Sequence, residues 1–396
     1  MKSYAKLSAS ILAAAAISGL ASPAIADEIR VGVIGPMSGP TAYLGSQFKE
    51  AIELYLSQHD NKAGSHTVKV LFRDDGGFSP ARAKQLAQEL VVRDKVSYLA
   101  GLAVTPTALA AAEVATKAKV PIVIFNAGTA SITRKSPYML RAGFSQWTVS
   151  VPLANWAAKE GGCKKAALAV ADYAPGLDSL EAYRKTFTEA GGKVVEELRI
   201  PLATTDYSSY MQKIKDSQPD CLFMFSPAGP QAVGFVKAFE SSGLAAAGIK
   251  ALGIAETQEV DLPAFGDSAL GIITSSIYSA SNDTPENKQF VAGLKQKFGA
   301  AVQPDFFSVE AYDGMHMIFE MIKRTDGKQD GNKAIDSVLG MKWVSPRGPV
   351  SIDPKTRDLI QNVYIRRVEK LGTGYVNQTF FTVPDVKDPW KEQNPE

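Results

Sequence analysis

The 396-residue sequence predicts an α/β protein built from two doubly wound, parallel-sheet lobes. Short β-rich runs alternate with helical stretches from residue 29 onward. The runs are apolar on both faces, which is typical of parallel strands that helices cover on both sides of the sheet. The alternation breaks at residues 138–144 and then restarts, so two β/α sets of similar length follow one another.

The first set has clear helix signals. Phe48, Ile52 and Tyr55 recur at helical spacing, and Ser79 with Pro80 forms an N-cap followed by proline at the first helical position. The expected strands are 29–34, 68–72, 98–100 and 120–125, and the expected helices are 45–58, 80–92 and 106–118.

The second set has the same architecture without a detectable sequence repeat. The expected strands are 165–171, 194–200, 221–225 and 249–254, and the expected helices are 146–161, 177–190, 206–216 and 230–242. The pattern changes from Gly271 onward. A strand at 272–278, helices at 285–298, 307–323 and 332–339, and an antiparallel hairpin of 350–352 with 362–368 are expected there. The last dozen residues are polar and contain proline, which predicts a loose end.

The N-terminus has the features of a cleaved signal peptide. Lys2 and Lys6 precede the apolar run 11–17, and residues 24–26 supply the small-x-small pattern of a cleavage site before Asp27. The run is too short for a membrane span, which needs about 20 apolar residues. We therefore expect a soluble, periplasmic protein. The mature length exceeds what one core usually organises, so two domains are expected.

The charge balance argues against nucleic acid or anionic lipid as a partner. Removal of residues 1–26 takes away two lysines and no acid, so the formal charge falls from +2 to 0. A neutral chain with interspersed charges has no broad electrostatic attraction for polyanions.

Catalytic motifs are not found in the sequence. It has no Gly-x-Ser-x-Gly elbow, no phosphate-binding P-loop and no His-Glu-x-x-His pair. The three histidines, His59, His66 and His316, are expected in a loop or packed in a helix. The glycines after the first strand (Gly32, Gly35, Gly39 and Gly45) do not match the dinucleotide fingerprint. We expect a binding protein with no catalytic residue, metal or cofactor.

The loops that follow the strands indicate a site for a small ligand. Segments 105–107, 126–129 and 226–229 are small, hydroxyl-bearing and rich in exposed backbone. Each leads toward a helix N-terminus, where free N–H groups favour an anion such as a carboxylate. Ordinary helix capping is the alternative for any single loop.

The order of motifs resembles the periplasmic substrate-binding proteins of ABC importers, of the leucine/isoleucine/valine-binding type. The resemblance extends over the whole mature chain. It rests on segments 31–40 with Gly45, 73–75, 121–129, 172–176, 266–271 and 311–313.

This resemblance implies a type I periplasmic binding fold whose lobes a three-segment hinge joins. The first lobe would comprise residues 27–144 with 276–345, and the second 145–275 with 346–396. The expected ligand-binding residues are Thr105, Ala127, Gly128 and Thr129 in the first lobe and Tyr173, Ala228 and Glu256 in the second. Thr105 and Thr129 would hydrogen-bond the polar end of the ligand, Ala127 would contribute backbone, and Glu256 would pair with a ligand ammonium.

Two further expectations depend on the implied fold. In a 2-1-3-4-5 sheet the first and third strands of the second lobe are neighbours, so Cys163 and Cys221 are expected to form a disulfide. Ala228 and Gly229 stand where amino-acid binders carry an aromatic residue, which would leave room for a bulkier ligand.

The expected function is capture of branched-chain amino acids or related small carboxylates by hinge closure, with delivery to a membrane permease by a monomeric protein. Aromatic acids or amides are the alternative ligands. A sensor that feeds a membrane receptor and an exported enzyme acting on small carboxylates are the rival functions.

Overall fold

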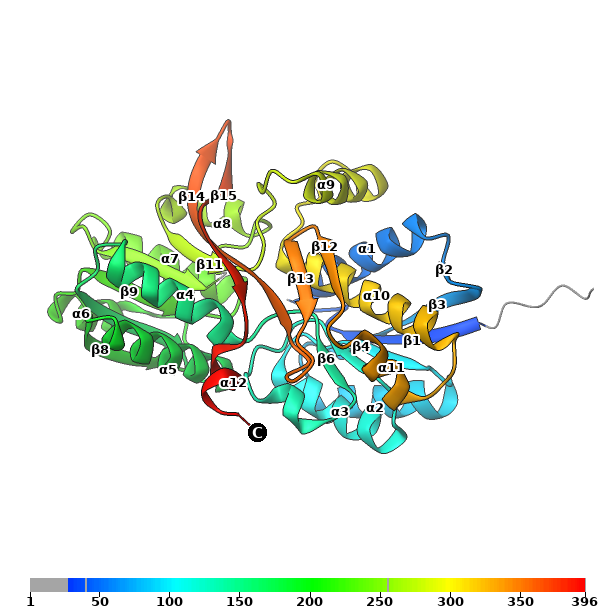
Figure 1. Cartoon of the computed structure of the whole chain (residues 1–396). Coiled ribbons are helices and arrows are strands. Elements are labelled where there is room, and N and C mark those ends of the chain that lie inside the picture. Colours follow the sequence, from blue (N-terminus) through cyan, green and yellow to red (C-terminus); the bar gives the residue numbers. More distant parts are fainter. Residues whose placement is uncertain (1–27, 40, 255, 396) are drawn as a thin grey trace, which may run out of the picture.

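The computed structural model describes residues 28–39, 41–254 and 256–395. The expected signal peptide, residues 1–26, lies outside the described residues and stays a prediction. Figure 1 shows two lobes, each with a central sheet flanked by helices. The predicted α/β class with two parallel-rich lobes is confirmed.

The first sheet has six strands in the order β2-β3-β1-β4-β5-β6, parallel throughout except for the pair β2–β3. The strands are β1 (Glu28–Gly35), β2 (Lys62–Ala63), β3 (His66–Asp74), β4 (Tyr98–Gly101), β5 (Ile122–Ile124) and β6 (Met139–Arg141). The intervening helices are α1 (Ala42–Gln58), α2 (Pro80–Gln88) with the π-helical turn η1 (Glu89–Arg93), α3 (Thr105–Ala118) and the 3-10 turn η2 (Ile132–Lys135). Ser79 caps α2 as expected, since its side chain accepts a hydrogen bond from the Arg82 N–H.

The second sheet contains the predicted 2-1-3-4-5 order as β8-β7-β9-β10-β11. The strands are β7 (Lys165–Ala171), β8 (Lys193–Ile200), β9 (Cys221–Phe225), β10 (Lys250–Ile254) and β11 (Ile273–Ser276). The helical elements are α4 (Gln146–Lys159), α5 (Ala174–Glu189), α6 (Ser208–Asp216), α7 (Pro230–Ser241), α8 (Leu262–Phe265) and the 3-10 turn η3 (Gly266–Ala269).

The chain passes between the two sheets three times. It leaves the first sheet after β6, returns after β11 to place α9 (Pro285–Phe298) and α10 (Phe306–Thr325) against α1, and crosses again after α11 (Gly331–Val338). The last strands are β12 (Lys342–Ser345), β13 (Gly348–Ile352), β14 (Leu359–Leu371) and β15 (Gly374–Val386), all antiparallel to their neighbours.

The C-terminal region contains one confirmed element and two corrections. The hairpin of β13 and β14 is confirmed. Strand β15 was not predicted, because most of its side chains are exposed or half-buried and show no apolar alternation. The prediction of a loose C-terminal end is also wrong. Helix α12 (Pro389–Gln393) packs on α4, and the buried Asp388 and Lys391 pair with Arg141 and Asp358, respectively.

Cys163 and Cys221 form a disulfide whose Cα atoms are 5.9 Å apart. Cys163 precedes β7 and Cys221 begins β9, the strand that pairs with β7. The bond therefore joins neighbouring strands within the second lobe.

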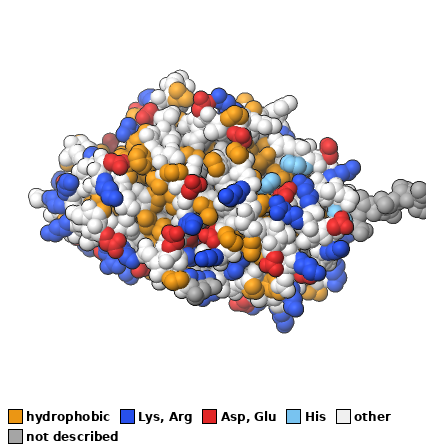
Figure 2. All heavy atoms as spheres, in the orientation of Figure 1, with side chains coloured by type: hydrophobic (Ala, Val, Ile, Leu, Met, Phe, Trp, Pro, Cys, Tyr) orange, Lys and Arg blue, Asp and Glu red, His pale blue; other side chains and the backbone are white. Residues whose placement is uncertain are grey.

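The visible face in Figure 2 carries interspersed basic and acidic side chains, in keeping with the low net charge of the sequence. Among the described residues, no helix combines the length and hydropathy that crossing a membrane requires.

We predict that the protein, denatured without reductant, releases no free thiol. Chain-entropy arithmetic for a cross-link between residues 58 apart gives a stabilisation of about 4 kcal/mol. The double variant Cys163→Ala/Cys221→Ala should lose that much unfolding free energy in urea titrations. The reduced wild-type protein is the control and should match the variant. Two free thiols in unreduced protein would contradict the bond.

Candidate functional site

A cavity of about 320 Å³ lies between the lobes, where the carboxyl ends of strands from both sheets meet. Six aromatic rings line it: Phe78, Phe144, Tyr173, Phe225, Phe306 and Phe307. The other lining residues are Thr41, Leu44, Ala103, Val104, Thr105, Asn126, Gly128, Gln146, Pro175, Ser226, Pro227, Ala228, Pro230, Gln231, Ile254 and Gln258. No Asp, Glu, Lys, Arg or His is found among the described residues that line this cavity.

The N-terminus of α3 supplies the polar part of the first-lobe wall. Thr105 begins the helix, and its hydroxyl lies 2.9 Å from the hydroxyl of Thr129. The Asn126 side chain donates to the Ala103 carbonyl at 2.9 Å and so holds the two strand-end loops together. Free N–H groups and the helix dipole at this end favour a negatively charged group.

The loop at residues 126–129 has an unusual backbone conformation and packs closely against Gln146 of α4. Ala127 has φ of +107°, which is rare for a residue with a side chain. A Cβ on Gly128 would lie 2.6 Å from the side-chain amide nitrogen of Gln146, so a larger residue there would displace the end of the Gln146 side chain. The Gln146 N–H also donates to the Gly128 carbonyl at 2.8 Å, which fixes the loop against α4.

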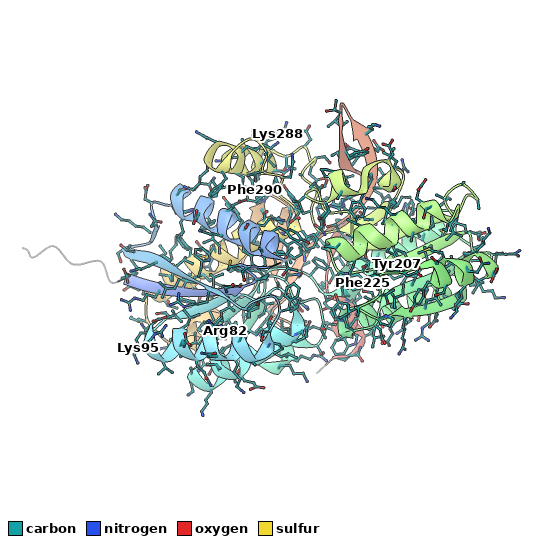
Figure 3. All side chains as sticks on the ribbon, turned by 180° about the vertical axis from the view of Figure 1, so that it is seen from behind. Arg82, Lys95, Tyr207, Phe225, Lys288 and Phe290 are labelled. Atoms are coloured by element: carbon teal, nitrogen blue, oxygen red, sulfur yellow. A yellow bond between two sulfur atoms is a disulfide. The ribbon has the colours of Figure 1, made fainter. Side chains whose placement is uncertain are left out.

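The second-lobe wall contributes two aromatic rings to the cavity, Tyr173 and Phe225. Tyr173 and Phe225 stack with ring centroids 6.0 Å apart and planes inclined by 13°. Figure 3 shows Phe225 on the side of the second lobe that faces the first, with Tyr207 farther out. Burial, together with the neighbouring carboxyl of Glu256, raises the pKa of Tyr173, so this phenol stays neutral. Such a wall suits a flat apolar ring better than a charged group.

Glu256 is buried behind this wall and does not line the cavity. One of its carboxyl oxygens accepts from the Ser226 N–H at 3.4 Å, and the other has no hydrogen-bond partner among the described residues. Burial raises its pKa to about 8. Glu256 is therefore largely protonated at neutral pH, and the amide side chain of Gln258 reaches the cavity instead.

The structure brings only some of the expected site residues to the cavity. Thr105, Gly128, Tyr173 and Ala228 line it, whereas Ala127, Thr129 and Glu256 do not. Sequence reasoning missed most of the aromatic lining. Phe306 and Phe307 begin α10, more than 150 residues after the strand-end loops of the first lobe, and no local pattern connects them with the site.

The lobes approach one another closely at two places beside the cavity. The Ala130 N–H of the first lobe donates to the Asp178 carboxylate of α5 at 2.9 Å. A Cβ on Gly229 of the second lobe would lie 3.2 Å from the Tyr43 hydroxyl of α1. The Gly229 N–H in turn donates to Asp261 at 3.1 Å. The small residues at 228–229 therefore leave space that the first lobe partly fills with Tyr43.

Comparison with known families gives a match to the periplasmic binding protein family over residues 28–373. The chain is 48% identical over 381 residues to a Brucella melitensis protein described as Leu/Ile/Val-binding protein homolog 6. The alignment covers 96% of this chain and 97% of that protein.

Two solved structures are similar to nearly the whole chain. The chain is 49% identical, with a TM-score of 0.88, to an ABC-transporter solute-binding protein of R. palustris in complex with 4-hydroxybenzoate, covering 91% of this chain and 98% of that one. It is 45% identical, with a TM-score of 0.87, to a Rhodopseudomonas palustris solute-binding protein in complex with 3,4-dihydroxybenzoic acid, covering 92% and 99%.

We predict that Glu256→Gln stabilises the protein increasingly as the pH rises. A raised pKa means that the folded state holds the proton more tightly than the unfolded chain. Stability is therefore lost between pH 4.5 and about 8, as the unfolded chain ionises first. The gain in unfolding free energy of the variant over wild type should grow by about 3 kcal/mol from pH 5 to pH 8.

Urea titrations at several pH values measure this difference. The matched control is Glu189→Gln, an exposed glutamate on the same lobe, whose effect should not change with pH. A pH-independent difference for Glu256→Gln would mean that the carboxyl ionises at its ordinary pKa.

Proposed function

The chain belongs to the periplasmic binding protein family, and from that premise we propose that it binds an aromatic carboxylate and delivers it to an ABC importer. It is the solute-binding protein of an ABC transporter. The aromatic ligand class is what we propose beyond the transport role, and one observation supports it above all. The cavity combines six aromatic rings with the absence of any charged side chain among its described lining residues.

An α-amino acid fits this lining poorly. Its ammonium group would need a carboxylate partner, because an unpaired buried charge is very costly. The nearest expected partner, Glu256, is held neutral by burial and faces backbone atoms behind the wall. The description of the Brucella relative as Leu/Ile/Val-binding favours amino acids, and they remain the second candidate.

An aromatic acid fits the cavity with both its carboxylate and its ring. Its carboxylate can accept hydrogen bonds from N–H groups at the start of α3 and at Gly128 and from the Thr105 hydroxyl. Such charge-assisted bonds are worth about 1.5–3 kcal/mol each. Its ring would meet Tyr173, Phe225 and the other rings, and each well-placed aromatic pair adds about 0.5–1.5 kcal/mol. The relatives that bind hydroxybenzoates support the same ligand class.

The mechanism we propose is capture by hinge closure. The ligand binds first to the strand-end loops of the first lobe, and the second lobe then closes over it and adds contacts such as Ala130 to Asp178. A ligand that binds the closed form better shifts the equilibrium toward that form. No bond is made or broken in this scheme, so the protein acts as a binding protein and not as an enzyme.

The relatives are periplasmic binding proteins of ABC transporters, which implies the periplasm as the location of this protein. We propose that it reaches the periplasm through cleavage before Asp27, and that it works as a monomer that docks on a membrane permease.

A thermal-shift screen of ligand-free protein tests the ligand class. We expect benzoate, 4-hydroxybenzoate or 3,4-dihydroxybenzoate to stabilise the protein by about 2.7 kcal/mol at 100 times the dissociation constant. Leucine, isoleucine and valine should give no shift. A response confined to these amino acids would overturn the aromatic ligand while leaving the transport role in place.

Thr105→Val should weaken binding of 4-hydroxybenzoate about tenfold, because it removes one hydroxyl donor and leaves Thr129 without its partner. Isothermal titration calorimetry measures the change. Thr116→Val on the same helix is the matched control, since its hydroxyl bonds the Ala112 carbonyl away from the cavity. Equal affinities of Thr105→Val and wild type would remove Thr105 from the site.

A further inference from the structure

Four ionisable side chains, which we call the Arg141 cluster, are buried together beside the ligand cavity. They are Arg141, Asp358, Asp388 and Lys391, and none is more than 5% exposed. Two positive and two negative groups balance within the cluster. They come from β6, from the segment before β14 and from the C-terminal helix α12.

The guanidinium of Arg141 bonds to both carboxylates. Its Nε donates to Asp358 at 2.8 Å and its Nη2 to Asp388 at 3.3 Å. Lys391 completes the set by bonding the second oxygen of Asp358. Asp388 also caps α12, because its other oxygen accepts from the Trp390 N–H at 2.9 Å. Since a planar guanidinium donates in fixed directions, these contacts leave Arg141 one orientation.

The remaining nitrogen of Arg141 reaches the ligand loop. Its Nη1 donates to the Ala127 carbonyl at 3.2 Å and to the Thr129 carbonyl at 2.9 Å. In a planar trans peptide the C=O and the N–H of the same unit point in opposite directions. Holding the Ala127 carbonyl therefore directs the Gly128 N–H away from Arg141, and Gly128 lines the cavity.

The bond from Arg141 to the Thr129 carbonyl orients a second N–H group, which contacts the second lobe. The Thr129 carbonyl shares its peptide plane with the Ala130 N–H, which donates to Asp178 of the second lobe. One guanidinium nitrogen thus sets two peptide planes, of which one serves the cavity and the other the contact between the lobes. Ala127 needs such support because its φ of +107° is unfavourable for an alanine.

The C-terminal segment supplies one of the two carboxylates that hold Arg141. In Figure 1 the last strand runs down from the second lobe to α12, which lies at the junction of the two lobes. Asp388 and Lys391 of this segment are separated from Arg141 by about 250 residues of sequence, and they add one negative and one positive charge to the Arg141–Asp358 pair.

We propose that Arg141, held by Asp358 and by the C-terminal Asp388, is a positioning residue that aims the Gly128 and Ala130 N–H groups at the ligand carboxylate and at the second lobe. The carboxylate part of this inference rests on the proposed function. The aiming of the loop itself does not depend on which ligand binds.

The variant Asp388→Asn tests the inference, since asparagine keeps the helix cap but removes the charge that holds Arg141. Calorimetry should show about tenfold weaker binding of 4-hydroxybenzoate. The uncharged 4-hydroxybenzamide should lose much less affinity, because the loop acts on the carboxylate. Asp330→Asn, which changes the cap of α11 in the same way, is the matched control and should change neither affinity.

Hydrogen exchange of the ligand-free protein gives a second readout that needs no ligand. Peptides spanning 126–131 should exchange faster in Asp388→Asn than in wild type or Asp330→Asn, while peptides from the sheet strands keep their rates. Unchanged exchange at 126–131, or faster exchange throughout the chain, would overturn the positioning role. Equal loss of affinity for the acid and the amide would also overturn it.

Calorimetry and hydrogen exchange together distinguish a failure of the proposed ligand class from a failure of the positioning role. If wild-type protein binds no aromatic acid, the proposed ligand class fails, and exchange at 126–131 alone decides whether Arg141 positions the loop. If wild type binds 4-hydroxybenzoate and Asp388→Asn binds it equally well with unchanged exchange, the ligand class stands and the positioning role fails.

Discussion

The structure depends on one constraint, that parallel strands followed by helices place all their strand-to-helix loops at the same edge of the sheet. Both lobes obey it, and their loop-bearing edges face one another around the ligand cavity. The ligand is therefore met by a helix N-terminus, exposed backbone and four rings from the first lobe, and by Tyr173 and Phe225 from the second. A carboxylate can be bound there without a basic side chain, because peptide dipoles supply the positive potential.

Where the chain passes between the lobes, charge is buried and paired. Arg141, Arg347 and Arg366 are at most 2% exposed, and carboxylates accompany them at Asp358, Asp313 and Glu259. Such pairs add little net stability compared with apolar packing, but removing one partner is costly. Their directed hydrogen bonds fix how the crossing segments lie, and this geometry is what a cavity shared by two lobes requires.

The fold could be predicted from sequence because its signals are local. The strand 221–225 and the helix 285–298 have the predicted bounds, since apolar runs and caps mark them directly. The site was only partly predictable. Thr105 and Gly128 follow strands, whereas Phe306 reaches the cavity through tertiary packing. Strand β15 was missed because its side chains show no apolar alternation, although it forms a hairpin with the preceding strand β14. Helix α12 was missed because its cap residue Asp388 is held by Arg141, which is distant in sequence.

The interleaving of the chain between the lobes has a consequence for biosynthesis. Helix α1 of the first lobe packs on α10, which ends at Thr325, and β11 of the second lobe pairs with β14, which ends at Leu371. A nascent chain therefore cannot complete either lobe until most of its length has been synthesised. Incomplete lobes leave apolar surface uncovered and gain little from partial folding. The order of segments along the chain thus delays folding until nearly the whole polypeptide is available.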